Sequence, residues 1–216
     1  MMRFKAVALH FTVILMATLG AARLAAAEPV QLVGFGDSLM AGYQLPQEDA
    51  LPAQLQRALV AKGHDVVITN AGFSGDTTSG GLSRVDWSVP DGTDGVILEL
   101  GANDALRGIP PDQSEKNLDQ IISRLKARGI PILLVGVLAP PNMGAQYGET
   151  FNAIYPRLAA KHALPLYPFI LDGVITERSL LLEDGMHPNT KGLAVMAQRM
   201  LPLAEELVKS VEGKSK

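Results

Sequence analysis

The feature that most constrains the fold is a regular alternation of short apolar segments and helical segments from residue 29 onward. The apolar segments are nearly continuous, as in strands that are buried on both faces of a sheet. The clearest helical segment spans residues 110–129, where apolar residues recur at i, i+3, i+4 and i+7 and Gly129 ends the pattern. The alternation predicts strands over residues 30–36, 65–72, 94–104 (including the exit from that strand), 130–138 and 164–169.

Five strand–helix units in one line predict a parallel, three-layer α/β/α sandwich with right-handed crossovers. For five strands we expect the flavodoxin-like order 2-1-3-4-5. In this order the first and third strands are neighbours, and ligands bind outside their carboxyl ends. Helices are predicted over residues 48–63, 77–87, 110–129, 147–163 and 189–210, with Pro156 kinking or splitting the fourth and Asn189 or Thr190 capping the last.

The first 27 residues are typical of a secretory signal peptide. A short positive segment precedes an apolar segment of about 17 residues, and Ala25–Ala27 supply the small residues of a cleavage site before Glu28. The alternative is an uncleaved anchor helix, although the apolar segment is near the lower limit for a membrane span and His10 interrupts it. We expect cleavage, a periplasmic or secreted protein, and a single domain over residues 28–216 with a polar tail at about 211–216.

Composition excludes several classes of function. The chain has no cysteine, so disulfides, thiolate metal sites and a cysteine nucleophile are excluded. Its formal net charge is −3 and it contains no run of lysine or arginine, so nothing indicates a nucleic-acid partner. We expect a monomer that needs neither a metal ion nor a cofactor, and that has no stable membrane anchor after cleavage.

Four polar segments follow predicted strands and therefore meet at one edge of the predicted sheet. Ser38 comes directly after the first strand, residues 74–81 after the second and residues 101–104 after the third. Residues 183–189 lie beyond the fifth strand, before the last helix. The turns at the opposite edge are plainer, so the carboxyl edge is the expected functional site.

Ser38 is either a turn or cap serine, or a nucleophile that needs a base. His64 and His162 are predicted to lie away from this edge, which leaves His187. Asp184 precedes His187 by three residues, a spacing that can fold the carboxylate back onto Nδ1 and leave Nε2 free to accept the serine proton. The alternative for residues 184–189 is a turn that caps the last helix.

Three donors at the same edge could stabilise an oxyanion: the side-chain amide of Asn103 and the main-chain N–H groups of Gly75 and Ser38. The alternatives are a simple turn at residues 101–104 and a phosphate-binding loop at residues 74–81. Gly34 and Gly36 are expected to let the backbone turn before Ser38, at the start of a helical turn. Asp37 is assigned a structural role, because the acid of a triad must lie on the far side of the histidine.

In these motifs the sequence resembles the SGNH (GDSL) hydrolases over about residues 30–205. The family blocks match "FGDSLMAGY" with Ser38, "NAGFSGDTT" with Gly75, "ELGANDALRG" with Asn103, and "DGMHPN" with Asp184 and His187. The segments "GANDALRGIPP" and "NAIYPRLA" resemble the periplasmic acyl-CoA thioesterase I / lysophospholipase / arylesterase type, apart from an alanine at position 102, where some members have glycine. The resemblance implies the strand order given above, and ester hydrolysis by a triad of Ser38, His187 and Asp184.

Two loops at this edge, residues 105–111 and 138–147, are apolar enough to line an acyl-binding wall. Substrates are then small-molecule acyl esters or thioesters. The predicted wall residues are Leu106, Ile109, Pro110, Leu138, Pro140 and Met143.

Other functions remain open from the sequence. They are a carbohydrate O-acetylesterase with the same triad, and a flavin-binding or lipid-carrying module without catalysis. An α/β-hydrolase is disfavoured because no G-x-S-x-G elbow occurs.

Overall fold

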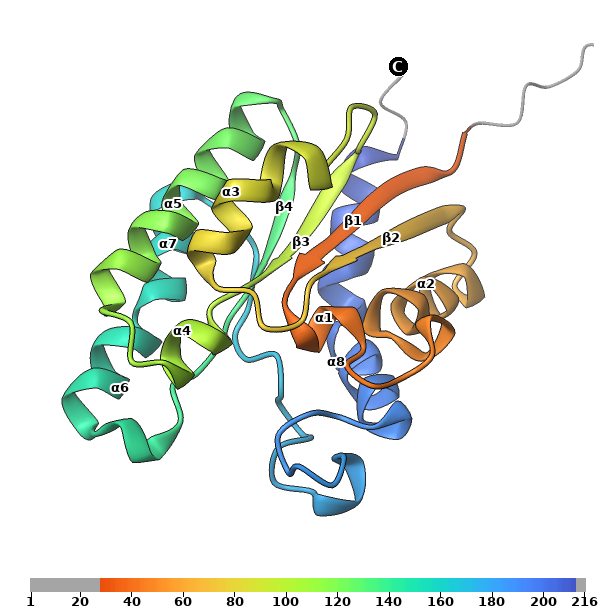
Figure 1. Cartoon of the computed structure of the whole chain (residues 1–216). Helices are drawn as coiled ribbons and strands as arrows, with labels where there is room; N and C mark the ends of the chain where they lie inside the picture. Colours follow the sequence, from red (N-terminus) through yellow and green to blue (C-terminus); the bar gives the residue numbers. More distant parts are fainter. Residues whose placement is uncertain (1–27, 213–216) are drawn as a thin grey trace, which may run out of the picture.

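A five-stranded parallel sheet forms the centre of the structure, a computed structural model that describes residues 28–212 (Figure 1). Its order is β2-β1-β3-β4-β5, so the predicted fold class and strand order are confirmed. The first and third strands are neighbours, with Leu32 opposite Gly95 and Phe35 opposite Leu98. The strands are β1 (Val30–Gly36), β2 (Val66–Gly72), β3 (Gly95–Glu99), β4 (Ile132–Val135) and β5 (Leu166–Tyr167).

Helices cover both faces of this sheet. Figure 1 shows α2 and α8 on one face and α3, α5 and α7 on the other. The α-helices are α1 (Ser38–Ala41), α2 (Leu51–Ala61), α3 (Thr78–Ser88), α4 (Ala102–Leu106), α5 (Pro111–Ala127), α6 (Ala145–Asn152), α7 (Ile154–His162) and α8 (Thr190–Val211). Three 3-10 turns are η1 (Gln47–Asp49), η2 (Pro141–Met143) and η3 (Arg178–Leu180).

The last two strands and the fourth predicted helix differ from the prediction in extent. β4 and β5 are shorter than the apolar segments 130–138 and 164–169. β4 ends where its neighbour β3 ends, and β5 ends where its neighbour β4 ends, because no further strand residues remain to pair with. The predicted helix 147–163 is split at Ala153 into α6 and α7. Pro156 lies in the first turn of α7, where its missing N–H costs no helical hydrogen bond.

The capping of the last helix follows the prediction. The side chain of Asn189 accepts hydrogen bonds from the N–H groups of Lys191 and Gly192 at the start of α8. These bonds satisfy two of the N–H groups that a helix leaves without a partner.

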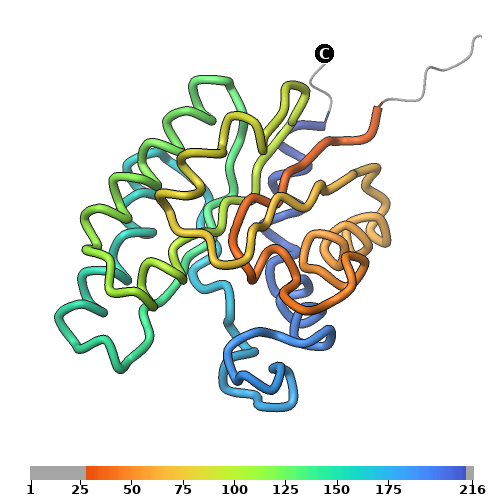
Figure 2. Tube along the Cα trace, in the orientation of Figure 1, coloured from red at the N-terminus to blue at the C-terminus, as the bar shows by residue number. Residues whose placement is uncertain are grey.

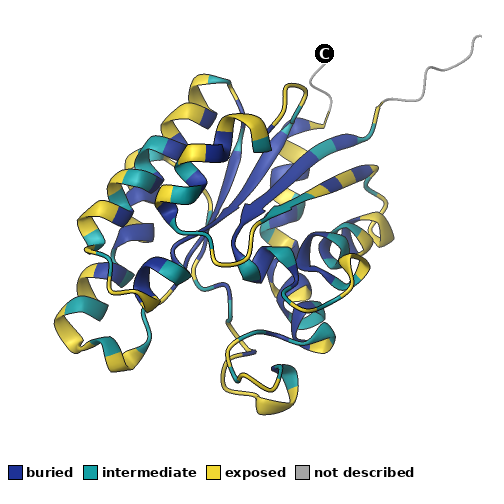
Figure 3. Cartoon of the chain, in the orientation of Figure 1, coloured by how far each residue is buried: buried dark blue, intermediate teal, exposed yellow. Residues whose placement is uncertain are grey.

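The core lies on both sides of the sheet. Figure 3 shows the inner strands β1, β3 and β4 almost entirely buried, whereas buried and exposed residues alternate at the start of the edge strand β2 and the outer faces of the helices are exposed. Phe35 and Leu98 are completely buried from the strands, and Ile121 of α5 and Met200 of α8 are completely buried from the two helical layers. Burial on both faces explains why the inner strands β1, β3 and β4 are apolar at nearly every position.

Two of the predictions, the signal peptide and the polar tail, concern the termini of the chain. The predicted signal peptide, residues 1–27, and residues 213–216 of the predicted tail lie outside the described residues. Among residues 28–212, no helix combines the length and hydropathy that crossing a bilayer would require.

The carboxyl ends of the strands are where distant segments meet. In Figure 2 the segments after β1, β2 and β3 converge at one edge of the sheet. The long segment between β5 and α8 extends from the same edge and returns toward α8 (Figure 2). His187, near the end of this segment, lies within hydrogen-bond distance of Ser38.

Candidate active site

Ser38 is the first residue of α1, directly after β1, and its main-chain N–H is therefore one of those that a helix leaves without an internal partner. Asp37 caps this helix by accepting the Leu39 N–H at 3.0 Å. Gly34 and Gly36 do not supply the turn, contrary to the prediction, because both lie within the regular strand. Both are needed for close packing: a Cβ on Gly34 would lie 2.8 Å from Met40 Sδ, and one on Gly36 would lie 2.6 Å from a carboxylate oxygen of Glu99.

The structure brings Ser38, His187 and Asp184 together in a chain of hydrogen bonds. Ser38 Oγ lies 2.9 Å from His187 Nε2, and His187 Nδ1 lies 2.7 Å from Asp184 Oδ2. His64 lies in the turn after α2, 2.8 Å from Glu212, and His162 ends α7, 2.6 Å from Asp119, so neither takes part. With the imidazole proton on Nδ1, Nε2 can accept the serine proton.

Asp184 is held as a carboxylate. Its second oxygen, Oδ1, accepts the main-chain N–H groups of Met186 at 2.9 Å and His187 at 3.0 Å. Desolvation raises the pKa of Asp184, but these two hydrogen bonds and the one to the His187 ring outweigh it and lower the pKa to about 2. The group therefore stays negatively charged near neutral pH.

The loop that carries His187 is fixed by its own main chain and by Arg178. The Leu182 N–H donates to the His187 carbonyl at 2.7 Å, and the guanidinium of Arg178 donates to the carbonyls of Leu182 and Glu183. The ring of Tyr43 packs against the imidazole, with the two ring centroids 4.3 Å apart. The imidazole is thus held by hydrogen bonds at its two ring nitrogens and by packing against the Tyr43 ring.

Gly75 lies in a tight turn in which the Asp76 N–H donates to the Phe73 carbonyl at 3.0 Å. Its φ of +85° is a conformation that favours glycine. Arg107 Nη2 donates to the Gly75 carbonyl at 2.8 Å, whereas the Gly75 N–H has no acceptor within residues 28–212. Gly75 is therefore anchored through its carbonyl, and its N–H is left available as a donor.

Asn103 lies in α4, at the end of β3. Its Nδ2 donates to Asp37 Oδ2 at 3.3 Å, which uses one of its two N–H bonds and leaves the other. The next residue, Asp104, is completely buried and ties α4 to its neighbours by accepting the Thr78 N–H at 2.8 Å and the Ser114 hydroxyl at 2.9 Å. The main-chain N–H of Gly75 and the second N–H of the Asn103 amide are thus free to donate to a bound group.

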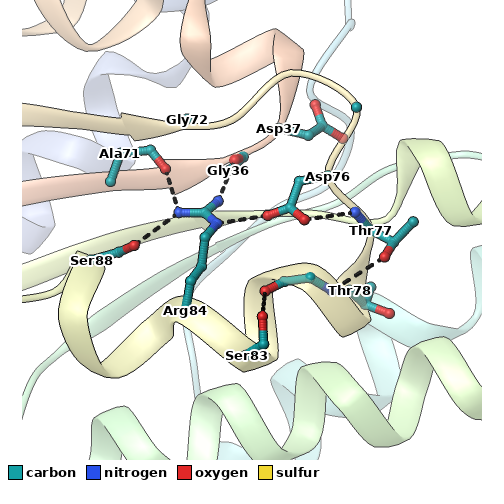
Figure 4. A network of polar contacts seen from close by, with 12 residues as sticks. Gly36, Asp37, Ala71, Gly72, Asp76, Thr77, Thr78, Ser83, Arg84 and Ser88 are labelled. Carbon is teal, nitrogen blue, oxygen red and sulfur yellow. Dashed lines mark hydrogen bonds and ion pairs between the residues drawn. The ribbon is translucent and has the colours of Figure 1, made fainter.

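Arg84 of α3 links the segments that carry Ser38 and Gly75 (Figure 4). Its Nη2 donates to the Gly36 carbonyl at 2.8 Å and its Nη1 to the Ala71 carbonyl at 2.9 Å. Its Nε donates to Asp76 Oδ2 at 2.7 Å, and the guanidinium lies 4.1 Å from the centre of the Phe35 ring. One buried side chain therefore joins the ends of β1 and β2 to the turn of Gly75.

Four further residues of this site were not predicted from the sequence: Glu99, Arg84, Arg107 and Tyr43. Glu99 left a signal, since it is the only charged residue in the apolar segment "GVILEL" of the third strand. It is completely buried, and so is Asp37. The other three leave no comparable signal, because nothing near them in the sequence indicates their partners.

The predicted wall residues are exposed to different degrees. Leu106 and Leu138 are among the exposed large apolar side chains, and Ile109, Pro110 and Pro140 are partly or fully exposed. Met143 lines an open cavity of about 540 Å³, together with residues that include Pro111 and Tyr147.

The two wall loops are connected. The Tyr147 hydroxyl donates to the Ile109 carbonyl at 2.8 Å, and a Cβ on Gly108 would lie 3.5 Å from Met143 Cε.

Within residues 28–212, no group of three or more histidine or acidic side chains is placed to hold a metal ion.

Comparisons with known proteins agree with this geometry. Residues 35–195 match the GDSL-like Lipase/Acylhydrolase family. The chain is 42% identical over 180 residues to an "Arylesterase" of Vibrio mimicus, covering 83% of this chain and 88% of the relative. It is 37% identical over 187 residues to the "Thioesterase 1/protease 1/lysophospholipase L1" of Escherichia coli strain K12, covering 86% and 88%. The crystal structure of TesA superposes with a TM-score of 0.78 at 35% identity, covering 82% of this chain and 99% of that one.

Proposed function

Because this chain belongs to the GDSL-like lipase/acylhydrolase family, we propose that it hydrolyses carboxylic esters and thioesters with Ser38 as nucleophile, His187 as base and Asp184 as its partner. Family membership and the named relatives make the chain an ester-hydrolysing enzyme. The observation that carries the assignment of residues is the single imidazole that lies 2.9 Å from Ser38 Oγ and 2.7 Å from Asp184 Oδ2.

The reaction proceeds in two halves. Ser38 Oγ attacks the carbonyl carbon while His187 Nε2 takes the hydroxyl proton, and the tetrahedral intermediate expels the alcohol or thiol, which receives that proton. Water then attacks the acyl-enzyme while His187 Nε2 takes its proton. The second tetrahedral intermediate releases the carboxylic acid, and the proton passes from His187 to Ser38 Oγ, which restores the free enzyme. The negative charge on the substrate oxygen is stabilised by the N–H groups of Ser38 and Gly75 and the amide of Asn103, at about 2.7–4 kcal/mol per donor.

A covalent label tests the nucleophile. A fluorophosphonate should modify Ser38, because only a hydroxyl with an adjacent base attacks the phosphorus. Peptide mapping identifies the labelled serine. His187→Ala should abolish the label, while His162→Ala, at a partly buried histidine that is paired with Asp119 and not with Ser38, should leave it unchanged. An adduct on Ser74 or Ser79, or no adduct, would contradict the assignment.

The proposed substrate class is supported by exposed apolar side chains that follow β3 and β4 at the carboxyl edge of the sheet, where Ser38 follows β1. Leu106 and Leu138 are 51% and 41% exposed, and an acyl chain that covers them removes apolar surface from water. Each buried methylene is worth about 0.8 kcal/mol, close to fourfold in kcat/KM if the transition state benefits fully. We expect smaller gains, because an exposed loop loses conformational entropy when it orders around a substrate.

A series of p-nitrophenyl esters from acetyl to hexanoyl tests this substrate class. Wild-type kcat/KM should rise along the series, and Leu106→Ala or Met143→Ala should flatten the rise while acetyl ester turnover stays nearly intact. A profile that peaks at acetyl would instead favour a carbohydrate O-acetylesterase.

We also propose export with cleavage before Glu28, giving a periplasmic or secreted enzyme of one domain. The support is the signal-like segment of residues 1–27 with Ala25–Ala27 at its end. N-terminal sequencing of the protein from cells tests this, and a membrane-bound chain that begins at Met1 would show an anchor instead.

A further inference from the structure

Two buried carboxyl groups lie beside the nucleophile segment, and the reaction described above uses neither of them directly. Asp37 and Glu99 are both completely buried at the carboxyl ends of the adjacent strands β1 and β3. The Asp37 N–H donates to Glu99 Oε2 at 3.2 Å, and the two side chains lie within hydrogen-bonding reach of each other. This proximity holds because position 36 is glycine: a Cβ there would lie 2.6 Å from Glu99 Oε2.

The hydrogen bonds of the two groups are unequal. Asp37 accepts the Leu39 N–H at 3.0 Å and the Asn103 amide at 3.3 Å, both of which favour its ionised form. Glu99 accepts only the Asp37 N–H, and its Oε1 has no hydrogen-bond partner within residues 28–212. A proton on Glu99 would give that carboxyl group a donor aimed at the neighbouring carboxylate.

Two buried carboxylates in contact do not both ionise near neutral pH, because their repulsion is not screened by water. Desolvation and the neighbouring Asp37 raise the pKa of Glu99 well above its ordinary range. Desolvation also raises the pKa of Asp37, to about 6, although Leu39, His187 and Asn103 oppose the shift. The pair thus retains one proton, and the hydrogen bonds favour Glu99 as its holder.

We propose that Glu99 is a positioning residue that works in its protonated form, donating a hydrogen bond to the Asp37 carboxylate and thereby fixing both the Asn103 amide and the start of α1. This inference rests on the proposed role of Ser38 and Asn103. Loss of the proton places two negative charges in contact, which pushes the Asp37 carboxylate away from the groups that it orients.

Other ionisable groups surround the pair from several elements, and they limit what its titration can be attributed to. They are Asp76 before α3, Arg84 in α3, Asp104 in α4, Tyr155 in α7 and His187 before α8. Asp76 is paired with Arg84, and Asp104 accepts the Thr78 and Ser114 hydroxyls. Asp76 and Asp104 keep these hydrogen bonds when Glu99 alone is substituted, whereas Tyr155 loses a neighbour whose charge raises its pKa, so a change in the pH profile reports on the Glu99 charge and its effect on Tyr155.

The test compares wild type with Glu99→Gln and Glu99→Leu in kcat and KM from pH 5 to 10, on a p-nitrophenyl ester. Gln keeps a donor toward Asp37, so kcat at pH 7 should fall by no more than about threefold. Leu removes it, so kcat should fall by about ten- to hundredfold with little change in KM, as for one charge-assisted hydrogen bond. In wild type kcat should fall as rising pH ionises Glu99, whose pKa is raised by burial and by Asp37, and in Glu99→Gln this loss should move to higher pH or disappear.

Thermal melts provide a readout that does not depend on activity. The folded pair binds a proton that the unfolded chain releases above about pH 4.5, so wild type should lose stability relative to Glu99→Gln as the pH rises above that value toward the raised pKa of the folded pair. Glu115→Gln, at an exposed ion pair with Arg157, is the matched control and should change neither profile.

Two results would overturn the proposal: a fall in Glu99→Gln as large as in Glu99→Leu, or identical pH profiles of activity and melting for Glu99→Gln and wild type. If Glu99→Leu does not fold, the comparison of Glu99→Gln with wild type still decides. Failure of the fluorophosphonate to label Ser38 in wild type would instead refute the proposed nucleophile, and the melts would still test the shared proton.

Discussion

Replacing Arg84 with methionine should destabilise the protein and slow catalysis together. Arg84 and Asp76 form an ion pair at 2.7 Å with side chains only 9% and 10% exposed. Methionine has a similar length but neither charge nor donors. The substitution leaves the Asp76 carboxylate without its cation, and the Gly36 and Ala71 carbonyls without two of their donors.

Removing one partner of a buried ion pair costs about 3–5 kcal/mol, because the remaining charge is left uncompensated. A domain of this size has a free energy of unfolding of about 5–15 kcal/mol, so Arg84→Met should still fold at 25 °C. The double variant Arg84→Met/Asp76→Asn removes the stranded charge, while the Asn oxygen can still accept the Thr77 N–H. Its cost should be lower than the sum of the two single costs by at least about 1 kcal/mol.

Urea unfolding of the four proteins at pH 7 measures this coupling, and kcat for a p-nitrophenyl ester measures the effect on the site. The control is Arg157→Met, which breaks a two-point ion pair with Glu115 on the surface, where the arginine side chain is 47% exposed. It should cost no more than about 1 kcal/mol. If Arg84→Met costs as little as this control, or if the cycle shows no coupling, the buried pair does not hold the two strand ends.

Two further substitutions separate the parts of the site. Asn103→Ala should lower kcat by about 10²–10³ with a small change in KM, because an oxyanion donor acts mainly in the transition state. An unchanged kcat would show that Asn103 is not such a donor. Tyr43→Ala should lower kcat by less, since it removes packing against the His187 ring but no hydrogen bond of that ring, and a loss as large as that of His187→Ala would point to a direct role for Tyr43.

Periodicity predicted the parts of this fold that depend on long apolar patterns. The first strand has the predicted limits, 30–36, because a strand buried on both faces is apolar throughout and a polar residue marks its end. The short helix α4 was not predicted, since five residues are too few to show a helical period. The break between α6 and α7 was placed near Pro156 from the known effect of proline, but it lies at Ala153, because proline is accepted in the first turn of a helix.

The residues of the candidate site likewise divide into those that their position in the sequence predicts and those that depend on contacts in the folded chain. Ser38, Gly75, Asn103 and His187 could be assigned to one edge because each follows a strand, and parallel strands end together. Arg84 lies on a helix among small and polar residues, and its roles depend on carbonyls that come near it only in the folded chain. Asp37 could be separated from Asp184 by the logic of the triad, but its contact with Glu99 depends on the pairing of β1 with β3, and strand order does not specify side-chain contacts.

Acid should weaken the edge of the molecule opposite Ser38 through Glu205 of α8. Its carboxylate lies 2.6 Å from Lys209, 3.2 Å from Lys62 and 3.5 Å from His64, which joins the end of α2 to α8. The hydrogen bonds of Lys209 and Lys62 lower its pKa from 4.5 to about 2. A lowered carboxyl pKa contributes stability above the pKa of the unfolded chain, and this contribution is lost as the pH falls toward the pKa of the folded state.

Glu205→Gln should therefore melt at a lower temperature than wild type at pH 6, and the difference should close as the pH falls from about 4.5 to about 2. Added salt should reduce the difference at pH 6, because these charges are near the surface. The matched control is Glu206→Gln, at the exposed neighbouring position, which should melt like wild type at every pH. Ester turnover at pH 7 should be the same in all three proteins, since Glu205 lies at the far end of α8 from His187. Equal melting temperatures of Glu205→Gln and wild type at pH 6 would show that these ion pairs add no stability, and that acid unfolding begins elsewhere.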